Sequence, residues 1–131
     1  MIFVDTGAWF AAFVPNDADH AAADAWLEAN TELLVTTDYV IDELLTLMKI
    51  RGEFRRALHL GASLFAEEIA QIVWVLPDDI QQAWGIFQRY HDKGWSFTDC
   101  VSRVMMERLG MQRAFAFDDH FRQFGTVTVV P

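Results

Sequence analysis

The sequence predicts one α/β domain, residues 1–131, built on a five-stranded parallel sheet with helices on both faces in the doubly wound arrangement. Short apolar runs alternate with longer amphipathic stretches, and strands separated by helices pair in parallel. The 131 residues can bury one sizeable core but not two. Hydrophobic residues make up 53% of the chain and only three residues are proline, which is typical of a globular domain.

Five apolar runs have the length and composition of strands: residues 2–4, 33–36, 71–76, 114–117 and 127–130. The amphipathic stretches between them are the expected helices, at residues 16–30, 37–51, 53–68, 79–92 and 96–109. Thr37 or Asp38 caps the helix at 37–51, and Gly52 ends it. Pro77-Asp78 starts the helix at 79–92, and Gly110 closes the last one.

Cysteine content and hydropathy bear on the compartment. The single cysteine, Cys100, excludes an internal disulfide and a cysteine zinc cluster, and a reducing cytoplasm is its natural environment. No run approaches the ~18 continuous apolar residues of a membrane span. No basic residue precedes the first apolar stretch, unlike in a secretory signal. We therefore expect a cytoplasmic protein with no membrane partner.

The net charge of −9 limits how this chain could bind nucleic acid. Ten basic residues face nineteen acidic ones, and binding to a phosphate backbone draws its affinity from Lys and Arg. A broad electrostatic interaction is therefore not expected. Nucleic acid could still bind locally, with a divalent metal offsetting the charge of an acidic site and the basic run at residues 49–56 guiding the nucleic-acid strand. The alternative for this run is a solvated helix junction.

Acids from distant segments lie where strands end or helices begin: Asp5, Glu43, Asp99 and Asp118. Asp5 directly follows the first strand, so it lies at the carboxyl edge of a parallel sheet, where open α/β sheets bind ligands. Structural alternatives remain for three of them. Asp5 and Asp118 could each cap a helix, and Ser96 with Asp99 resembles a capping box.

Glu43 is harder to explain as a structural residue. At 100° per residue it falls within the apolar arc of its helix, whereas Asp42 points to the solvated side. No Lys or Arg lies three or four residues away to pair with it. A carboxylate beside the core loses solvation unless a positive charge meets it. A divalent cation shared with the other acids would supply that charge.

Convergence of these acids predicts a site for Mg²⁺ or Mn²⁺. Hard divalent ions prefer oxygen ligands and keep waters that can be shared with a phosphate. Such an ion polarises a phosphoryl oxygen and lowers the pKa of a bound water. The chemistry implied is phosphodiester hydrolysis.

Four segments carry a family resemblance: Val4-Asp5-Thr6, Asp42-Glu43-Leu44-Leu45, Ser96-Phe97-Thr98-Asp99-Cys100 and Phe117-Asp118-Asp119-His120-Phe121. In this order, over nearly the whole chain, they resemble the PIN-domain ribonucleases of the VapC toxin type. The resemblance implies that Asp5, Glu43, Asp99 and Asp118 bind Mg²⁺ or Mn²⁺ and that Thr6 and Thr98 support them. It also implies a five-stranded parallel sheet, an RNA substrate, a homodimer and a small antitoxin protein as inhibitor.

One departure from the family pattern concerns the fourth acid. Ala116 stands where the family often has Ser or Thr before Phe-Asp, so it is open whether Asp118 or Asp119 completes the site. The main alternative function is a non-catalytic PIN-fold module that binds a partner protein. The four histidines lack zinc spacing and are expected at the surface or at helix edges: His20, His59, His91 and His120.

Other phosphate-handling folds fit less well. A receiver domain needs a lysine on its last strand, and residues 127–130 contain none. A haloacid-dehalogenase-like phosphatase needs an acid two residues after the first, where this chain has Gly7. A P-loop NTPase needs a glycine-rich loop ending in Gly-Lys-Ser/Thr, which is absent.

Overall fold

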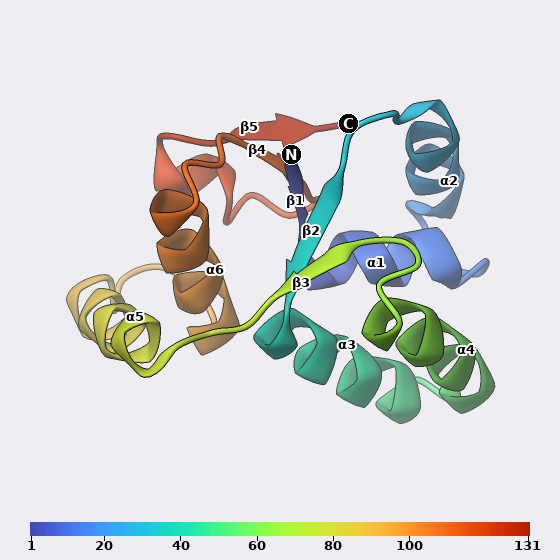
Figure 1. The fold of residues 1–131 in the computed structure, drawn as a ribbon, viewed down its shortest axis with the longest axis horizontal. Coiled ribbons are helices and arrows are strands. Elements are labelled where there is room, and N and C mark those ends of the chain that lie inside the picture. The colour runs from blue at the N-terminus through green and yellow to red at the C-terminus, as the bar shows by residue number, and fades with distance from the viewer.

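The computed structural model of this chain, which describes residues 1–131, contains one sheet of five parallel strands in the order β3-β2-β1-β4-β5 (Figure 1). The strands are β1 (Ile2–Val4), β2 (Leu34–Thr37), β3 (Gln71–Val73), β4 (Arg113–Phe115) and β5 (Thr128–Val130). All four strand pairs are parallel. The predicted α/β class and the five-stranded parallel sheet are confirmed.

Six α-helices cover the sheet: α1 (Thr6–Phe13), α2 (His20–Ala29), α3 (Asp38–Ile50), α4 (Phe54–Phe65), α5 (Pro77–Arg89) and α6 (Phe97–Arg108). A short 3-10 helix, η1 (Arg122–Phe124), lies between β4 and β5. Figure 1 shows α1 to α4 on one side and α5 and α6 on the other. This arrangement follows from right-handed crossovers, because the chain moves outward from β1 to β3 and then returns to β4.

The chain changes direction between β1 and β4. The connection after β1 covers one face of the sheet, and the connections on either side of β4 cover the other. Neighbouring strands whose connections diverge leave a crevice at their carboxyl ends, which is where open α/β sheets bind ligands. The residues that follow these two strands are Asp5 and the segment Ala116 to Asp118.

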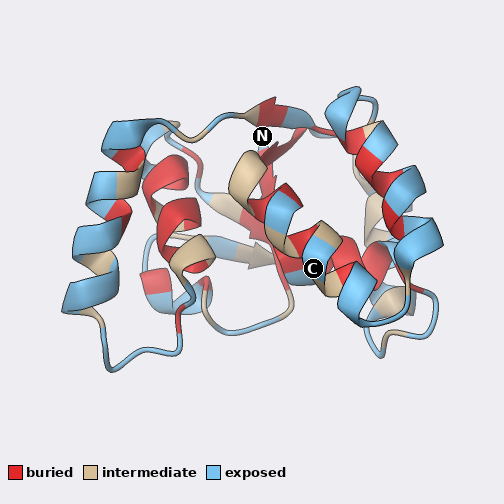
Figure 2. Ribbon diagram, turned by 90° about the horizontal axis from the view of Figure 1, so that it is seen from below, coloured by how far each residue is buried: buried red, intermediate tan, exposed pale blue.

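The core is centred on β1, which is covered on both faces. Ile2, Phe3 and Val4 have no exposed surface, and Trp9 of α1 is equally buried. On the helices, buried residues face the sheet and exposed residues face outward (Figure 2). A strand buried on both faces holds the residue that follows it in a fixed place. None of the helices is long and apolar enough to cross a bilayer.

Several predicted boundaries shift for identifiable reasons. The third strand was expected to continue to residue 76 but ends at Val73, because Asp38 Oδ1 accepts the Val75 N–H at 2.8 Å. The helix expected from residue 16 begins at His20, after a turn in which Asp17 Oδ2 accepts the Asp19 N–H. Thr37, one of the two expected caps, accepts the Val40 N–H and caps α3.

An ion pair between buried Asp79 and exposed Arg108 joins α5 to α6. Arg108 contacts both carboxylate oxygens of Asp79, at 2.9 and 3.0 Å, and Asp79 also accepts the Leu76 N–H at the start of α5. Asp79 is 2% exposed. A buried acid with two charged contacts and a backbone donor is well compensated. This pair therefore holds in place the layer that carries Asp99.

Candidate active site

Asp5 lies at the carboxyl end of the central strand and is 3% exposed. Its backbone N–H donates to the Phe115 carbonyl at 3.0 Å, which ties it to β4. Although it occupies the N-cap position of α1, its side chain makes no capping hydrogen bond. No Lys, Arg or His forms an ion pair with it. The capping alternative therefore does not account for this acid.

The environment of Asp5 opposes its ionisation. Burial raises the pKa of Asp5 well above the ordinary value, and the charges of Asp118, Asp99 and Glu43 raise it further. Only the Thr6 backbone N–H acts against this shift. Asp118, Asp99 and Glu43 are thus each close enough to Asp5 to raise its pKa.

Asp99, in the first turn of α6, has both a structural role and a perturbed charge. Its Oδ2 accepts the Ser96 N–H at 2.9 Å, and Ser96 Oγ accepts the Asp99 N–H at 3.0 Å. The capping box expected from the sequence therefore forms. Burial nevertheless raises the pKa of Asp99, and the Ser96 N–H and His120 only partly offset it. A cap does not exclude a second role for the same carboxylate.

Asp118 follows β4 and its side chain is 44% exposed. Its Oδ1 accepts the His120 N–H at 3.0 Å, forming a turn and not the helix N-cap that the sequence allowed. The neighbouring side chain of Asp119 is 82% exposed and pairs with Arg122. Asp118 is therefore the one of the two whose charge reaches Asp5 and Asp99.

Glu43 lies on α3 and is half-buried, whereas Asp42 is exposed, as the helical phase predicts. Glu43 forms no ion pair, and its charge raises the pKa of Asp5. Helix α3 begins directly after β2 and contacts both α1 and α6. It therefore carries Glu43 along the same edge of the sheet as Asp5.

Two hydroxyl residues flank the acids. Thr6 is 4% exposed, and its Oγ1 has no hydrogen-bond partner although it is buried. Thr98, the second residue of α6, is half-buried. Ala116, at the end of β4, is buried and contributes no hydroxyl. A buried hydroxyl without a protein partner is free to bond to a water or a ligand.

The structure adds His120 to this site. Its Nδ1 lies 2.8 Å from Asp99 Oδ2 and 3.8 Å from Asp118 Oδ2, and its side chain is 33% exposed. His120 reaches the surface, as predicted for all four histidines, but its contact with the acids was not predicted. His120 belongs to no zinc-like spacing, and its position two residues after Asp118 was the only signal available. A tight turn after β4 brings it back to the acids.

A cleft of about 330 Å³ opens beside the acids. Its lining residues are Gly7, Phe10, Asp17, Asp19, Leu47, Arg51, Phe117 and Asp118. Arg51 also lines an adjoining cleft of about 250 Å³ and forms no ion pair. The charged residues of the first cleft are all acidic except Arg51, so the cleft offers a phosphate one cationic contact.

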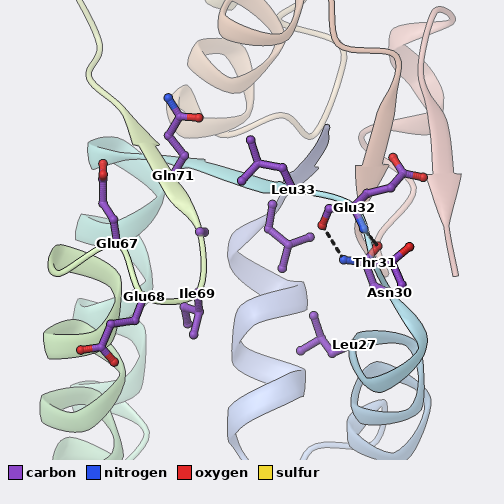
Figure 3. Close-up of a pocket in the computed structure, with 11 residues that line it drawn as sticks. Leu27, Asn30, Thr31, Glu32, Leu33, Glu67, Glu68, Ile69 and Gln71 are labelled. Atoms are coloured by element: carbon purple, nitrogen blue, oxygen red, sulfur yellow. Dashed lines mark hydrogen bonds between the residues drawn. The ribbon is translucent and has the colours of Figure 1, made fainter.

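A larger cleft, of about 620 Å³, lies elsewhere. It is formed at the amino ends of β2 and β3, and its lining includes Leu27, Glu32, Glu67 and Gln71 (Figure 3). Glu32 is already paired with Arg113, and Glu67 accepts the Ile72 N–H. None of the predicted site residues lines this cleft, so its size does not make it the candidate site.

The donor set fits a hard divalent cation. All four acids offer oxygen ligands, Asp5 is a buried carboxylate without a counter-charge, and Thr6 Oγ1 has no partner. As the side chains lie, no three acidic, histidine or cysteine groups are gathered closely enough to hold an ion together.

Acidification should stabilise the metal-free chain through Asp5. Because its folded-state pKa is raised, its contribution to stability is complete below the ordinary value of 3.8 and is lost as pH rises through the raised value. Relative to Asp5→Asn, the parent should therefore lose free energy of unfolding as pH rises above 3.8 and through the raised pKa of Asp5. Urea denaturation in chelator measures this, and a pH-independent difference between the two proteins would contradict it.

Comparisons with known proteins identify the family. The family model described as "PIN domain" matches residues 2–127. The 23S rRNA-specific endonuclease VapC20 of Mycobacterium tuberculosis is 33% identical over 131 residues, covering 100% of this chain and 99% of that protein. The crystal structure of VapC20 of Mycobacterium tuberculosis, a Sarcin-Ricin loop cleaving toxin, superposes with a TM-score of 0.92 at 32% identity, with both chains fully covered. A toxin-antitoxin complex from Klebsiella pneumoniae shares the fold alone, with a TM-score of 0.66 at 14% identity over 100% of this chain and 97% of that one. This chain belongs to the PIN-domain family, among its VapC-type ribonucleases.

Proposed function

We propose that this chain is an endoribonuclease that hydrolyses RNA with Mg²⁺ or Mn²⁺ bound by Asp5, Glu43, Asp99 and Asp118. The observation that carries the proposal is the buried carboxyl of Asp5, which lacks a counter-charge and lies among three acids that raise its pKa. An uncompensated buried charge costs several kcal/mol. A divalent cation would compensate all four acids at once and leave coordination positions for water and phosphate.

The metal, when bound, supplies Lewis acidity at a phosphoryl oxygen and lowers the pKa of the attacking water. The rigid end of β1 fixes Asp5, and the capping box fixes Asp99. The Thr6 hydroxyl, free of protein partners, is available to donate to a water or a phosphate oxygen, and Thr98 offers a second hydroxyl. Arg51, in the cleft beside Asp118, is the free cation that can contact a phosphate next to the scissile one.

The proposed substrate and compartment follow from the likeness to VapC20. Because this chain matches that 23S rRNA-specific endonuclease over 99% of its length, a large ribosomal RNA is the first substrate to test. The proposed compartment is the cytoplasm, where such RNA is found and where the single Cys100 stays reduced. We further propose that the 131 residues act as one domain.

Two partners are proposed, a second copy of the chain and a small antitoxin protein. Large apolar side chains are exposed in two areas. Single apolar residues on a surface are normal, but groups of them mark interaction sites. One area lies on α4 and includes Phe54, Leu58 and Phe65, and the other, from β3 to α5, includes Trp74 and Trp84. Light scattering of the purified chain, alone and with the product of any small adjacent reading frame, tests both.

A cleavage assay tests the proposed activity. RNA and DNA of the same sequence, and intact ribosomal RNA, are incubated with the purified chain in Mg²⁺, Mn²⁺ or chelator. We expect cleavage of RNA only, dependent on metal, because the acidic site binds phosphate poorly without a cation. Cleavage that survives chelator would exclude the metal mechanism. No cleavage of any RNA by a folded, Mn²⁺-binding chain would instead favour a non-catalytic binding module.

A further inference from the structure

We propose that His120 is a positioning residue that orients Asp99 for metal binding. This inference rests on the proposed metal site and adds a residue that neither the sequence pattern nor the comparisons assign. His120 Nδ1 lies 2.8 Å from Asp99 Oδ2. Because an ionised carboxylate only accepts hydrogen bonds, Nδ1 is the nitrogen that carries the proton toward it.

Asp99 is held by two donors on the same oxygen. Oδ2 accepts from the Ser96 backbone at 2.9 Å and from His120 at 2.8 Å, and no protein donor reaches Oδ1. Rotating the carboxylate would break both bonds. The pair therefore presents Oδ1 as the oxygen available to a cation. Hydrogen bonds to ligating carboxylates commonly set metal affinity in this way, and losing one costs 10–100-fold.

The ring of His120 is itself fixed by the turn after β4. Asp118 Oδ1 accepts the His120 backbone N–H at 3.0 Å. The next residue, Phe121, is fully buried and stacks on Phe3 of β1, with ring centroids 5.9 Å apart. On the outer edge of the ring, Nε2 faces Gly94. His120 thus connects two of the acids, because its backbone N–H bonds to Asp118 and its ring bonds to Asp99.

A simpler role would give the opposite result. If His120 were only a positive charge lying among acids, removing it would strengthen the binding of another cation. If His120 orients Asp99, removing it weakens that binding. The direction of the change in metal affinity therefore separates the two roles.

The test measures Mn²⁺ affinity by isothermal titration calorimetry. His120→Asn keeps an N–H donor at nearly the position of Nδ1, whereas His120→Ala removes it. We expect the Mn²⁺ dissociation constant to rise about 10-fold or more for His120→Ala and to stay within about 3-fold of the parent for His120→Asn. Arg122→Ala, in the same turn and paired only with exposed Asp119, should leave it unchanged. Saturating Mn²⁺ should restore most of the cleavage rate of His120→Ala.

The possible results separate this inference from the proposed function. Tighter Mn²⁺ binding by His120→Ala, or equal binding by all variants, would overturn the positioning role and leave the metal site intact. A parent that binds no Mn²⁺ would overturn both. If His120→Ala fails to fold in chelator, His120→Gln replaces it, because its longer side chain retains bulk but displaces the donor.

Discussion

Replacing Asp5 by Asn should reduce RNA cleavage at least about 100-fold, equivalent to about 2.7 kcal/mol of transition-state stabilisation. The same change should leave the metal-free chain as stable as the parent or more stable. Asp5 is buried without a counter-charge, and its neighbours Asp118 and Asp99 raise its pKa. Removing one of several repelling charges relieves the fold while depriving the cation of a ligand. Initial cleavage rates and urea denaturation in chelator measure the two effects.

A structural cap would behave differently, because Asn caps a helix about as well as Asp: Asp5→Asn would leave cleavage and stability unchanged, and only Asp5→Ala would destabilise the chain. Losing a helix cap costs about 1 kcal/mol on replacement by Ala. Manganese gives an independent check, since a ligand at about 100 times its dissociation constant adds roughly 2.7 kcal/mol to the stability of the state that binds it. Manganese should stabilise the parent in this way and Asp5→Asn much less. Equal stabilisation of both proteins would show that Asp5 is not a ligand.

Glu43→Gln should lower the cleavage rate at least about 10-fold, or about 1.4 kcal/mol, whereas Asp42→Asn should stay within a few-fold of the parent. These neighbours on α3 differ by about 100° around the helix. Only Glu43 is half-buried and raises the pKa of Asp5, while Asp42 is exposed. Rates at saturating RNA compare the two variants directly. A damaging Asp42→Asn beside a silent Glu43→Gln would refute the assigned helix face.

The second pair of neighbours provides the same control at the other side of the site. Asp118→Asn should also slow cleavage at least about 10-fold, and Asp119→Asn should not. The side chain of Asp119 is 82% exposed and pairs with Arg122, whereas that of Asp118 faces His120 and Asp99. Equal effects of both substitutions would mean that the charge of the turn matters and not one ligand position.

Much of the fold could be predicted because local patterns and global topology agree. The strand Ile2–Val4 is apolar at every position, and a strand buried on both faces requires that pattern. The side of α3 that carries Glu43 followed from helical periodicity alone. The end of β3 could not be predicted, because the acceptor for the Val75 N–H is Asp38, which lies 37 residues earlier in the chain.

His120 shows where sequence reasoning about the site reaches its limit. Residues on strand ends and helix faces have positions fixed by regular geometry, so Asp5 and Glu43 could be placed in advance. The direction of His120 depends on the turn made by Asp118 and on the packing of Phe121 against Phe3. Irregular segments take their shape from tertiary contacts, and no period in the sequence encodes them.

The early end of β3 also affects how copies of this protein can meet. An outer strand with unpaired backbone groups is a template on which a neighbouring molecule can add its own strand. Here that strand has only three residues, and the backbone N–H of Val75 just beyond it is already bonded to Asp38. The β3 edge therefore offers too short a border for a second molecule to extend the sheet there. We expect the proposed dimer to form through side chains and not through pairing of strands at this edge.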